Sequence, residues 1–502
     1  MITPSRKEFA ELAEKGNLIP VSSHVVADME TPVSAYMKMT RRPDGSEAPH
    51  SFLLESVEGG ENVARYSFIG VDPIAVFTHR GGKGILKDSD GATEEIPGDD
   101  VFAKVENVLR RYRRAEPPGE GRPPFTGGAV GYASYDVVSE FEDTVPRPES
   151  VPVDVPDAFF MVTGSMLVFD RVLHTIEIMV QARVDSPDEA DAAYDRAVAE
   201  IADIERRLAE PLPRPPIELD AAEAPLEFKS NKTKAEFEKM VETAKRHIYD
   251  GDIIQVVLSQ RFSADIAASP LSVYRALRTL NPSPYMFLLR CGGFDLVGAS
   301  PEVHAKSVDG VITVRPIAGT RKRGKTPEED AALAEELLAD PKERAEHVML
   351  VDLARNDIGR VAEIGSVEVG ELMVIEKYSH VMHIVSNVTG KLSEDFAADA
   401  VMRSTFPAGT LSGAPKVRAM RIISDLECEE RGPYGGAVAY FSFDGNLDSC
   451  ITIRTALLKD GKAYVQAGAG IVADSVPELE YQETVNKAKA MMKALAMASK
   501  FE

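Results

Sequence analysis

Two pairs of glutamates, far apart in the chain, are the residues whose type and spacing most directly suggest chemistry. Glu343 and Glu346 are three residues apart, as are Glu480 and Glu483, so on a helix the two members of each pair share one face. Exposed to water, such a pair repels by only roughly 0.2–0.5 kcal/mol. Brought together in a cleft, the four carboxylates require a cation, because an uncompensated buried charge costs about 3–5 kcal/mol. Since all four side chains offer oxygen, we expect Mg²⁺ as the cofactor.

Composition excludes several classes of partner. The chain has 502 residues and a net charge of −23, and nucleic acids and anionic membranes both require a basic surface, so neither is expected as a partner. No apolar run approaches the length that crosses a bilayer. Three scattered cysteines predict neither a disulfide framework nor a zinc site. We therefore expect a globular protein of the reducing cytoplasm.

The acidic pairs must be positioned by a fold that mixes strands and helices. Up to about residue 183, short apolar runs alternate with Gly, Asp and Pro, which is typical of an antiparallel sheet with a few helices. Ser186 and Pro187 begin a helix that runs to about Leu208, and a proline-rich break follows. We divide the chain into an N-terminal lobe (1–210), a linker (211–227) and a C-terminal lobe (228–502).

In the second half, helical and strand patterns alternate. A stripe that includes Phe237 and Val241 predicts a helix ending at Gly251, followed by a strand over 253–262. Further strands are predicted over 435–443, 450–458 and 463–467, and a last helix from about residue 477. Asp340 begins a capping box in which Glu343 is the third helical residue. Glu343 therefore has a competing structural role that Glu346 lacks.

Three glycine-containing segments of the second half are candidate ligand loops. Residues 315–321 and 409–416 combine glycine with basic and hydroxyl side chains. Gly468, Ala469 and Gly470 follow a predicted strand and offer backbone N–H groups to a carboxylate. One such segment alone is more often an ordinary turn. Together with the two acidic pairs, the three segments indicate a binding site for a small anion.

These segments resemble the chorismate-utilising enzymes, and within that family the component I chains of anthranilate synthase. The likeness covers about residues 20–495 and is carried by residues 252–259, 299–302, 315–324, 346–357, 410–420 and 467–487. It implies an α+β fold, a large antiparallel β-sandwich with surrounding helices. It also implies that the N-terminal lobe carries a tryptophan regulatory site and the C-terminal lobe binds chorismate.

Two positions distinguish the branches of this family. Isochorismate- and salicylate-forming members carry a water-activating lysine where this chain has Gln255. A neutral amide cannot serve as the base, which favours ammonia as the nucleophile. Aminodeoxychorismate synthases carry a nucleophilic lysine where this chain has Ala318. The resemblance therefore favours amination ortho to the ring carboxylate over the para route.

The resemblance implies roles for single residues. Mg²⁺ would be held by Glu346 and Glu483, with Glu343 and Glu480 reached directly or through water. His383 would transfer protons during pyruvate loss, and Glu302 would assist departure of the hydroxyl. The same pocket would contain a further set of catalytic and substrate-binding residues: Gly319, Thr320, Thr410, Tyr434, Arg454, Gly468, Ala469, Gly470 and Lys487.

The implied reaction is the first step of tryptophan biosynthesis. Ammonia adds at C2 of chorismate as the C4 hydroxyl leaves, and loss of the C2 proton and of pyruvate gives anthranilate. No cysteine lies in a glutaminase-like nucleophile elbow, so we expect ammonia from a separate glutamine amidotransferase (component II) in a hetero-oligomer. L-Tryptophan is the expected inhibitor, at a site made of Glu55, Ser56, Pro284, Tyr285 and Met286.

Simpler explanations stay open for several of these residues. Arg454 fits a strand residue in a buried salt bridge, Tyr434 fits a turn aromatic, and Glu483 with Lys487 fits an i,i+4 helix pair. Two other functions also stay open. One is an aminodeoxychorismate synthase component I, which Ala318 disfavours. The other is a Mg²⁺-dependent tryptophan sensor without catalysis.

Overall fold

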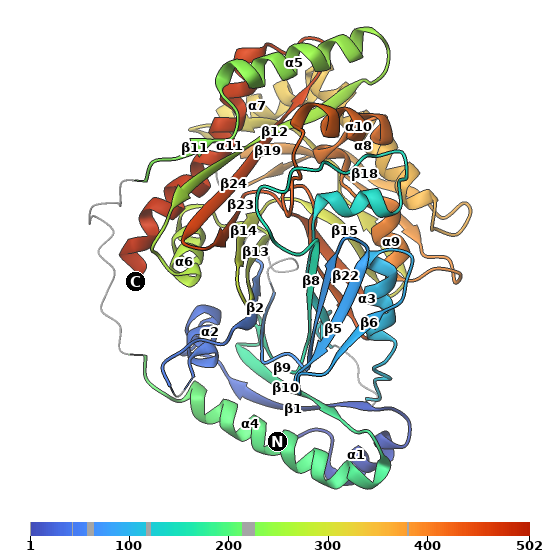
Figure 1. The fold of residues 1–502 in the computed structure, drawn as a ribbon, viewed down its shortest axis with the longest axis vertical. Helices are drawn as coiled ribbons and strands as arrows, with labels where there is room; N and C mark the ends of the chain where they lie inside the picture. The colour runs from blue at the N-terminus through green and yellow to red at the C-terminus, as the bar shows by residue number, and fades with distance from the viewer. Residues whose placement is uncertain (1, 43, 58–64, 117–121, 213–225, 379–380) are drawn as a thin grey trace.

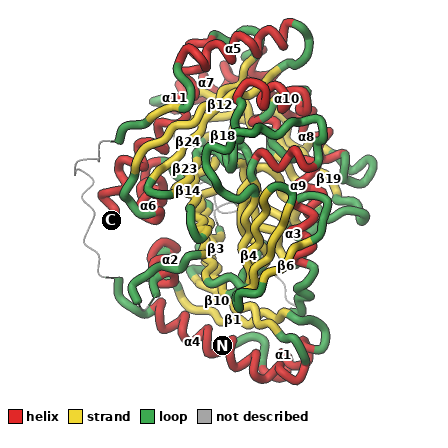
Figure 2. The backbone as a smooth tube through the Cα atoms, viewed as in Figure 1, coloured by secondary structure: helices red, strands yellow, loops and turns green. Residues whose placement is uncertain are grey.

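Two large antiparallel sheets face one another in the centre of the molecule, and the helices lie around them (Figure 1, Figure 2). The structure is a computed structural model and describes residues 2–42, 44–57, 65–116, 122–212, 226–378 and 381–502. The predicted α+β sandwich with surrounding helices is confirmed. Most of the predicted linker, residues 213–225, lies outside the described residues.

The first sheet joins strands from both halves of the chain. In spatial order they are β1 (Leu18–Val26), β10 (Thr175–Arg183), β9 (Ser165–Asp170), β3 (Tyr66–Val71), β2 (His50–Glu55), β13 (Tyr285–Cys291), β14 (Asp295–Ser300), β23 (Thr455–Lys459), β24 (Lys462–Ile471), β12 (Gln255–Asp265) and β11 (Lys229–Ser230), with β20 (Gly413–Ala414) also on β12. The halves meet where β2 pairs with β13.

The second sheet is built in the same way. Its order is β17 (Ile317–Lys322), β19 (Val381–Lys391), β16 (Val311–Val314), β15 (Val303–Val308), β22 (Leu447–Ile451), β21 (Ala437–Ser442), β7 (Gly128–Ala133), β8 (Ala158–Val162), β4 (Ala75–Arg80), β5 (Lys83–Asp88) and β6 (Thr93–Ile96), with β18 (Glu368–Lys377) beside β19. Here the halves meet where β7 pairs with β21. Strands of the N-terminal lobe therefore form one end of each sheet and strands of the C-terminal lobe form the other end.

Three apolar layers hold the sandwich together. Aromatic side chains fill the space between the sheets, including Phe52 and Phe287 from the first and Tyr132 and Phe159 from the second. The outer layer on the first sheet includes α1 (Arg6–Ala13), α2 (Pro32–Thr40), α4 (Ala190–Leu208), α6 (Pro270–Leu280) and α11 (Pro477–Met497). The third layer includes α3 (Val101–Leu109), α8 (Pro341–Gly359) and α9 (Ala398–Thr405), which pack on the second sheet. It continues to α5 (Lys234–Tyr249) and α10 (Lys416–Glu427), which pack on β12 of the first sheet, and α7 (Pro327–Ala339) packs on a smaller cluster near β19.

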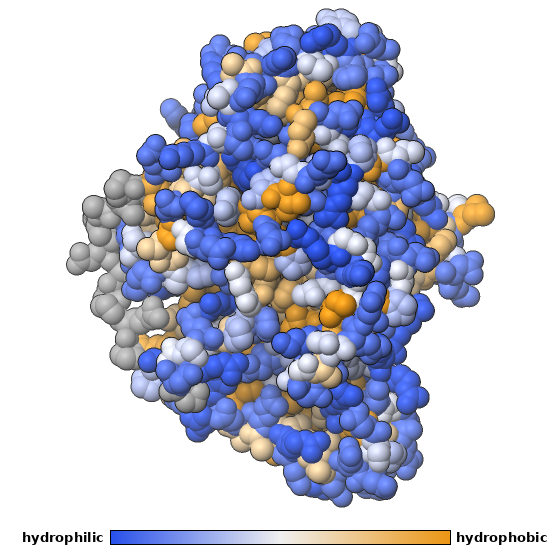
Figure 3. Space-filling model, viewed as in Figure 1, coloured by the Kyte–Doolittle hydropathy of each residue, from blue (hydrophilic) through white to orange (hydrophobic). Residues whose placement is uncertain are grey.

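The outer surface is as polar as the charged composition of the chain predicts. The face in Figure 3 is mainly hydrophilic, with apolar side chains visible in its central hollow. Among the described residues, no helix is both long and apolar enough to cross a membrane.

The predicted strand over 450–458 is wrong in one informative respect. The chain forms β22 in the second sheet, leaves it after Ile451, and enters the first sheet as β23 at Thr455. Arg454 lies in this crossover with a φ of 49°, a conformation that few residues other than glycine adopt. The run contains neither glycine nor proline, so its sequence gives no sign of the break. The crossover places Arg454 between the two sheets.

The last predicted strand is longer than expected. β24 extends to Ile471 and pairs with β12 along its whole length, so Gly468, Ala469 and Gly470 lie within the strand and do not follow it. Glycine is unfavourable inside strands, but the ladder with β12 overrides this local preference.

Candidate active site

The two acidic pairs occupy one electrostatic environment. Glu346 is on α8 and Glu480 is on α11, and burial raises the pKa of both carboxyls. The charges of Lys342 and Lys487 oppose that rise at both residues. A shared influence of the same two lysines requires that the acidic faces of α8 and α11 approach each other.

Two of the four carboxylates are already paired with cations. Glu483 Oε1 lies 2.7 Å from Lys487 Nζ, so the expected i,i+4 ion pair does form, and Glu343 Oε1 lies 3.1 Å from Arg321 Nη1. The only described group of three or more possible ligands within 4.8 Å of one another is elsewhere, at His79, Glu140 and Asp157. The four glutamates fit Mg²⁺ by donor type, since they offer only oxygens, and partial burial raises the pKa of two of them, Glu346 and Glu480.

The predicted capping box at the start of α8 forms on one side only. Asp340 accepts hydrogen bonds from the backbone N–H groups of Lys342 and Glu343, at 2.9 and 3.3 Å. Glu343 does not return a bond to Asp340, because the Asp340 N–H is taken by the carbonyls of α7. Its side chain turns to Arg321 instead, so the competing role of Glu343 is an ion pair and not a cap.

His383 is held in one tautomer by Gly319 and Thr320 of β17, where the pairing with β19 shifts in register. Its Nδ1 lies 2.9 Å from the Gly319 carbonyl and 3.1 Å from Thr320 Oγ1. A carbonyl only accepts, so Nδ1 carries the proton and Nε2 keeps a lone pair. Burial, with a contribution from the charge of Arg454, lowers the pKa of His383. The imidazole is therefore neutral at physiological pH and able to accept a proton.

Glu302 is a carboxyl kept close to neutral. Burial raises the pKa of Glu302 to about 7, against a hydrogen bond from Thr410 and the charges of Lys487 and Arg454. The Thr410 hydroxyl donates to Oε1 at 2.8 Å. A carboxyl that is partly protonated at neutral pH suits a general acid.

Arg454 is a partly buried cation that forms no ion pair within the described residues. Its guanidinium has no hydrogen bond or ion pair with any described residue, and burial lowers its pKa while Glu302 and Tyr434 act in the opposite direction. The alternative of a buried salt bridge is therefore not supported in the described part of the chain. An uncompensated guanidinium suits a ligand carboxylate.

The glycines of β24 face the same region. Val257 of β12 donates its N–H to Ser412, on the side away from β24, and it lies opposite Gly470. By the alternation of an antiparallel ladder, the N–H groups of Gly470 and Gly468 also point away from β12, whereas that of Ala469 bonds within the ladder. Two of the three predicted donors are thus directed off the sheet.

Tyr434 and Lys487 close this side of the pocket. A Cβ atom on Gly468 would lie 2.6 Å from the hydroxyl of Tyr434, so the tyrosine touches the strand only because residue 468 is glycine. Lys487 Nζ donates to the Gly468 carbonyl at 3.1 Å. Tyr434 is buried in a small apolar cluster with Leu411 and Ile451. A turn aromatic on the surface would not be buried in this way.

The two branch-specific positions lie in this region as well. Gln255 is buried, its Nε2 donates to Glu346 Oε1 at 3.3 Å, and a Cβ on Gly470 would lie 2.6 Å from the same nitrogen. Its Oε1 is buried without a partner among the described residues. Ala318 lies on β17, paired with Ile384 of β19.

The segments of the predicted tryptophan site are brought together by strand pairing. Glu55 of β2 lies opposite Met286 of β13. The Glu55 carboxylate already accepts hydrogen bonds from Arg171, Tyr274 and Arg278, at 2.9, 2.5 and 3.0 Å.

The other three members of that site differ in their surroundings. Ser56 has a buried hydroxyl without a partner in the described structure, and Pro284 is partly exposed. The Tyr285 hydroxyl donates to Asp448 at 2.9 Å. The Ser56 hydroxyl is therefore available to bond a ligand, whereas the Glu55 carboxylate and the Tyr285 hydroxyl already have partners.

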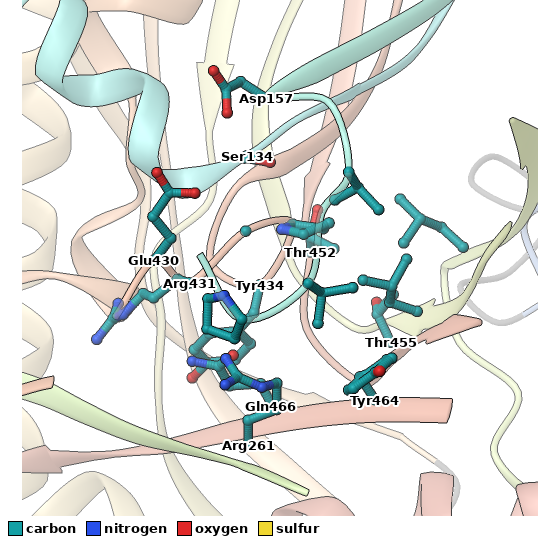
Figure 4. A pocket seen from close by; sticks show the side chains of 17 residues that line it. Ser134, Asp157, Arg261, Glu430, Arg431, Tyr434, Thr452, Thr455, Tyr464 and Gln466 are labelled. Carbon is teal, nitrogen blue, oxygen red and sulfur yellow. The ribbon is translucent and has the colours of Figure 1, made fainter. Parts of the chain in front are cut away.

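One set of residues beside the pocket was not predicted from the sequence. A second pocket lies behind Tyr434 (Figure 4), and its wall includes Arg431, Glu430 and Thr452. Glu427 and Arg431 form a buried ion pair four residues apart. That spacing was the available signal, but it is so common on exposed helices that it gave no reason to single out this pair.

Comparison with known proteins agrees with this geometry. The sequence model of the family described as chorismate binding enzyme matches residues 49–493. Among similar proteins, anthranilate synthase component 1 of Acetivibrio thermocellus is 48% identical over 99% of both chains, and that of Pseudomonas aeruginosa is 47% identical over 98% of this chain and 99% of the relative. The crystal structure of anthranilate synthase component I from Streptococcus pneumoniae is 37% identical, with a TM-score of 0.75 over 93% of this chain and 98% of that one.

Proposed function

Because the chain belongs to the chorismate-binding enzymes and, within them, to the component I chains of anthranilate synthase, we propose how it forms anthranilate from chorismate. Ammonia adds at C2 as the C4 hydroxyl departs, and pyruvate is then eliminated. The observation that carries this proposal is Arg454, a partly buried guanidinium with no hydrogen bond or ion pair to a described residue, whose charge lowers the pKa of both Glu302 and His383.

Substrate carboxylates supply the charge that Arg454 lacks. Chorismate is a dianion, and its enolpyruvyl carboxylate would accept from the Arg454 guanidinium and from the N–H groups of Gly468 and Gly470. Charge-assisted bonds to a carboxylate are roughly twice as strong as neutral ones. Tyr434, Lys487 and Thr410 complete this side of the pocket, and they fix the orientation of the ring.

Departure of the C4 hydroxyl needs a proton, and Glu302 is the group best suited to give it. The Thr410 hydroxyl occupies Oε1, which leaves Oε2 as the atom that carries the proton. A pKa of about 7 keeps a useful fraction of this carboxyl protonated at neutral pH. As the hydroxyl accepts that proton, it leaves as water.

Aromatisation requires removal of the proton at C2, which we attribute to Nε2 of His383. Its Nδ1–H is fixed on the Gly319 carbonyl, so the basic nitrogen is held in place during the transfer. The Thr320 hydroxyl, 3.1 Å from Nδ1, helps to hold the ring in this orientation. Gln255, a neutral amide, has no basic lone pair with which to activate water, so ammonia is the nucleophile.

Glu346 and Glu483 would hold Mg²⁺, with Glu343 and Glu480 bound directly or through water. When bound, the ion supplies positive charge that anchors and orients the ring carboxylate. Burial is the main cause of the raised pKa values of Glu346 and Glu480, and the charges of Glu343 and Glu483 add to it. A bound cation would offset this negative charge beside a dianionic ligand.

Partners and regulation follow the same proposal. Ammonia comes from a separate glutamine amidotransferase, component II, in a hetero-oligomer of the cytoplasm. L-Tryptophan inhibits by binding at Ser56, next to Glu55, with Pro284, Tyr285 and Met286 as the apolar wall.

The direct test is an assay of the purified chain with chorismate, Mg²⁺ and ammonium. We expect the fluorescence of anthranilate, pyruvate in equal amount, and no turnover of glutamine by the chain alone. A para-substituted product would instead indicate aminodeoxychorismate synthesis, and tryptophan binding without turnover would indicate a sensor. Either result rejects the proposal.

A further inference from the structure

A buried arginine outside the substrate pocket connects the segments that line it. Arg431 follows α10, and its side chain is only 1% exposed. Its Nε and Nη2 groups donate to the two carboxylate oxygens of Glu427, at 2.8 and 2.7 Å. A buried bidentate pair of this kind fixes the guanidinium plane in one orientation.

The same ion pair bonds to two separate backbone segments. Arg431 Nη1 donates to the Leu411 carbonyl at 2.8 Å, and Nη2 donates to the Val257 carbonyl at 2.7 Å. Glu427 Oε1 accepts from the backbone N–H and the hydroxyl of Ser259, at 2.8 and 2.9 Å. The pair therefore ties β12 to the loop that precedes β20.

Each of these segments supports a group of the proposed pocket. Leu411 is next to Thr410, the hydrogen-bond donor to Glu302. On β12, Val257 lies opposite Gly470, and Ser259, two residues further along the strand, lies opposite Gly468. A shift of either segment would move the hydroxyl of Thr410 or the N–H groups of β24.

The third connection is to Tyr434. The Arg431 guanidinium carbon lies 5.7 Å from the centre of the Tyr434 ring. Figure 4 shows both residues in one wall of the second pocket, the one behind Tyr434. Asp136 accepts hydrogen bonds from the backbone N–H groups of Arg431 and Gly432. The backbone that leads to Tyr434 thus begins at a residue fixed at both its main chain and its side chain.

We propose that Arg431 is a positioning residue for the carboxylate-binding half of the pocket, and that it acts through Glu427, Leu411 and Val257. This inference rests on the proposed function. The Arg431 charge is neutralised by Glu427, so unlike Arg454 it is not offered to the substrate. A buried ion pair is not required for stability, because well-packed apolar residues often serve as well. What apolar residues cannot supply is a rigid set of donors that fixes two carbonyls at once.

The test compares Arg431→Lys and Glu427→Gln with Arg65→Lys. Lysine keeps the charge but lacks the fork, and glutamine keeps the shape of Glu427 but not its charge. Arg65 makes a similar two-point pair with Asp170: its Nε donates to Oδ1 at 3.2 Å and its Nη2 to Oδ2 at 2.7 Å. Arg65 directly precedes β3 and Asp170 ends β9, both far from the pocket in the order of the first sheet. Chorismate binding is measured by calorimetry with Mg²⁺ and without ammonium, and turnover is measured separately.

In Arg431→Lys we expect the Kd and KM for chorismate to rise about tenfold, with kcat within about threefold and the KM for ammonium unchanged. Glu427→Gln should raise the chorismate KM about threefold, and it decides the question if Arg431→Lys fails to fold. Arg65→Lys should leave the chorismate constants within about twofold even where its melting temperature falls equally.

Two outcomes reject the positioning role. One is chorismate binding within twofold of the parent in the folded Arg431 and Glu427 variants. The other is an equal loss in Arg65→Lys, which would show general loosening of the fold. A parent protein that does not bind chorismate rejects the proposed function, and the positioning role with it.

Discussion

The hydroxyl of Thr410 donates a 2.8 Å hydrogen bond to Oε1 of Glu302, and this contact adjusts the protonation of a buried carboxyl. Burial raises the pKa of Glu302 to about 7, and the Thr410 bond acts against that rise. The two effects leave the carboxyl divided between its acid and its anion at neutral pH. A carboxyl whose pKa lies near the working pH can donate a proton at little cost in free energy, because its acid and its anion are nearly equal in free energy at that pH.

Replacement of Thr410 by valine should shift the pH profile upwards. The lost hydrogen bond favoured the charged form, so the pKa of Glu302 rises. If protonated Glu302 is the acid, kcat falls as the pH rises through that pKa, and in Thr410→Val the fall occurs at higher pH. The measurement is kcat against pH with the concentration of unprotonated ammonia held constant. Glu302→Gln is the control, with kcat lower by about 10²–10⁴-fold and no such limb. An unchanged limb in Thr410→Val contradicts the assignment.

The same carboxyl predicts a pH-dependent difference in stability. The folded pKa of Glu302, about 7, lies above its unfolded value of about 4.3. Between these values the folded state binds the extra proton, so this contribution to stability is present at low pH and is lost as the pH rises towards 7. Glu302→Gln removes the titration. Its melting temperature relative to the parent should therefore be higher at pH 8 than at pH 5, and a constant difference would mean that Glu302 titrates normally.

Replacement of Arg454 should stabilise the fold and weaken chorismate binding. Arg454→Met removes a partly buried charge that has no hydrogen bond or ion pair with a described residue, which should raise the free energy of unfolding by on the order of 1 kcal/mol. Because a charge-assisted bond to the substrate is lost, the KM for chorismate should rise about 10–100-fold. Thermal melting and steady-state kinetics test both halves. Arg65→Met, which breaks the ion pair with Asp170, should lower the melting temperature and leave KM unchanged. A less stable Arg454→Met protein would reveal an anionic partner for the guanidinium.

The regular elements were predictable because their patterns are local. The helix ending at Leu208 and the antiparallel strands of the first half follow from local signals, namely Ser186 and Pro187 at the helix start and Gly, Asp and Pro at the turns. The turn of the backbone at Arg454 did not follow, because a left-handed residue in an apolar run is imposed by the two sheets that it connects. Neither did the extension of β24 through Gly468 and Gly470, which the partner strand β12 stabilises. The candidate site was found by resemblance to a family, whereas the pair Glu427 and Arg431 became visible only when burial was known.

Replacement of single glutamates should distinguish those that bind the metal ion from glutamates on the same helix that do not. We expect Glu346→Gln and Glu483→Gln to weaken Mg²⁺ binding at least tenfold, because a neutral amide is a poor replacement for a carboxylate on a hard cation. Glu478→Gln is the matched control on α11, where Glu478 pairs with Lys234 and is 70% exposed. Calorimetric titration with MgCl₂ reports binding independently of turnover, and EDTA should abolish activity in the parent. Equal affinity in all three variants would place the ion elsewhere.

Tryptophan inhibition should depend on the buried hydroxyl of Ser56, which has no partner among the described residues. A buried hydroxyl without a partner costs roughly 1–3 kcal/mol, so a ligand that supplies the missing bond binds more tightly for that reason. Ser56→Phe fills the space and removes the hydroxyl, and we expect activity without tryptophan to be unchanged while inhibition is lost. Ser56→Ala separates the two effects: it keeps the space, and should weaken tryptophan about tenfold without abolishing inhibition. Ser46→Phe, in an exposed turn before β2, should be inhibited like the parent. Normal inhibition of Ser56→Phe would show that tryptophan binds elsewhere on the chain.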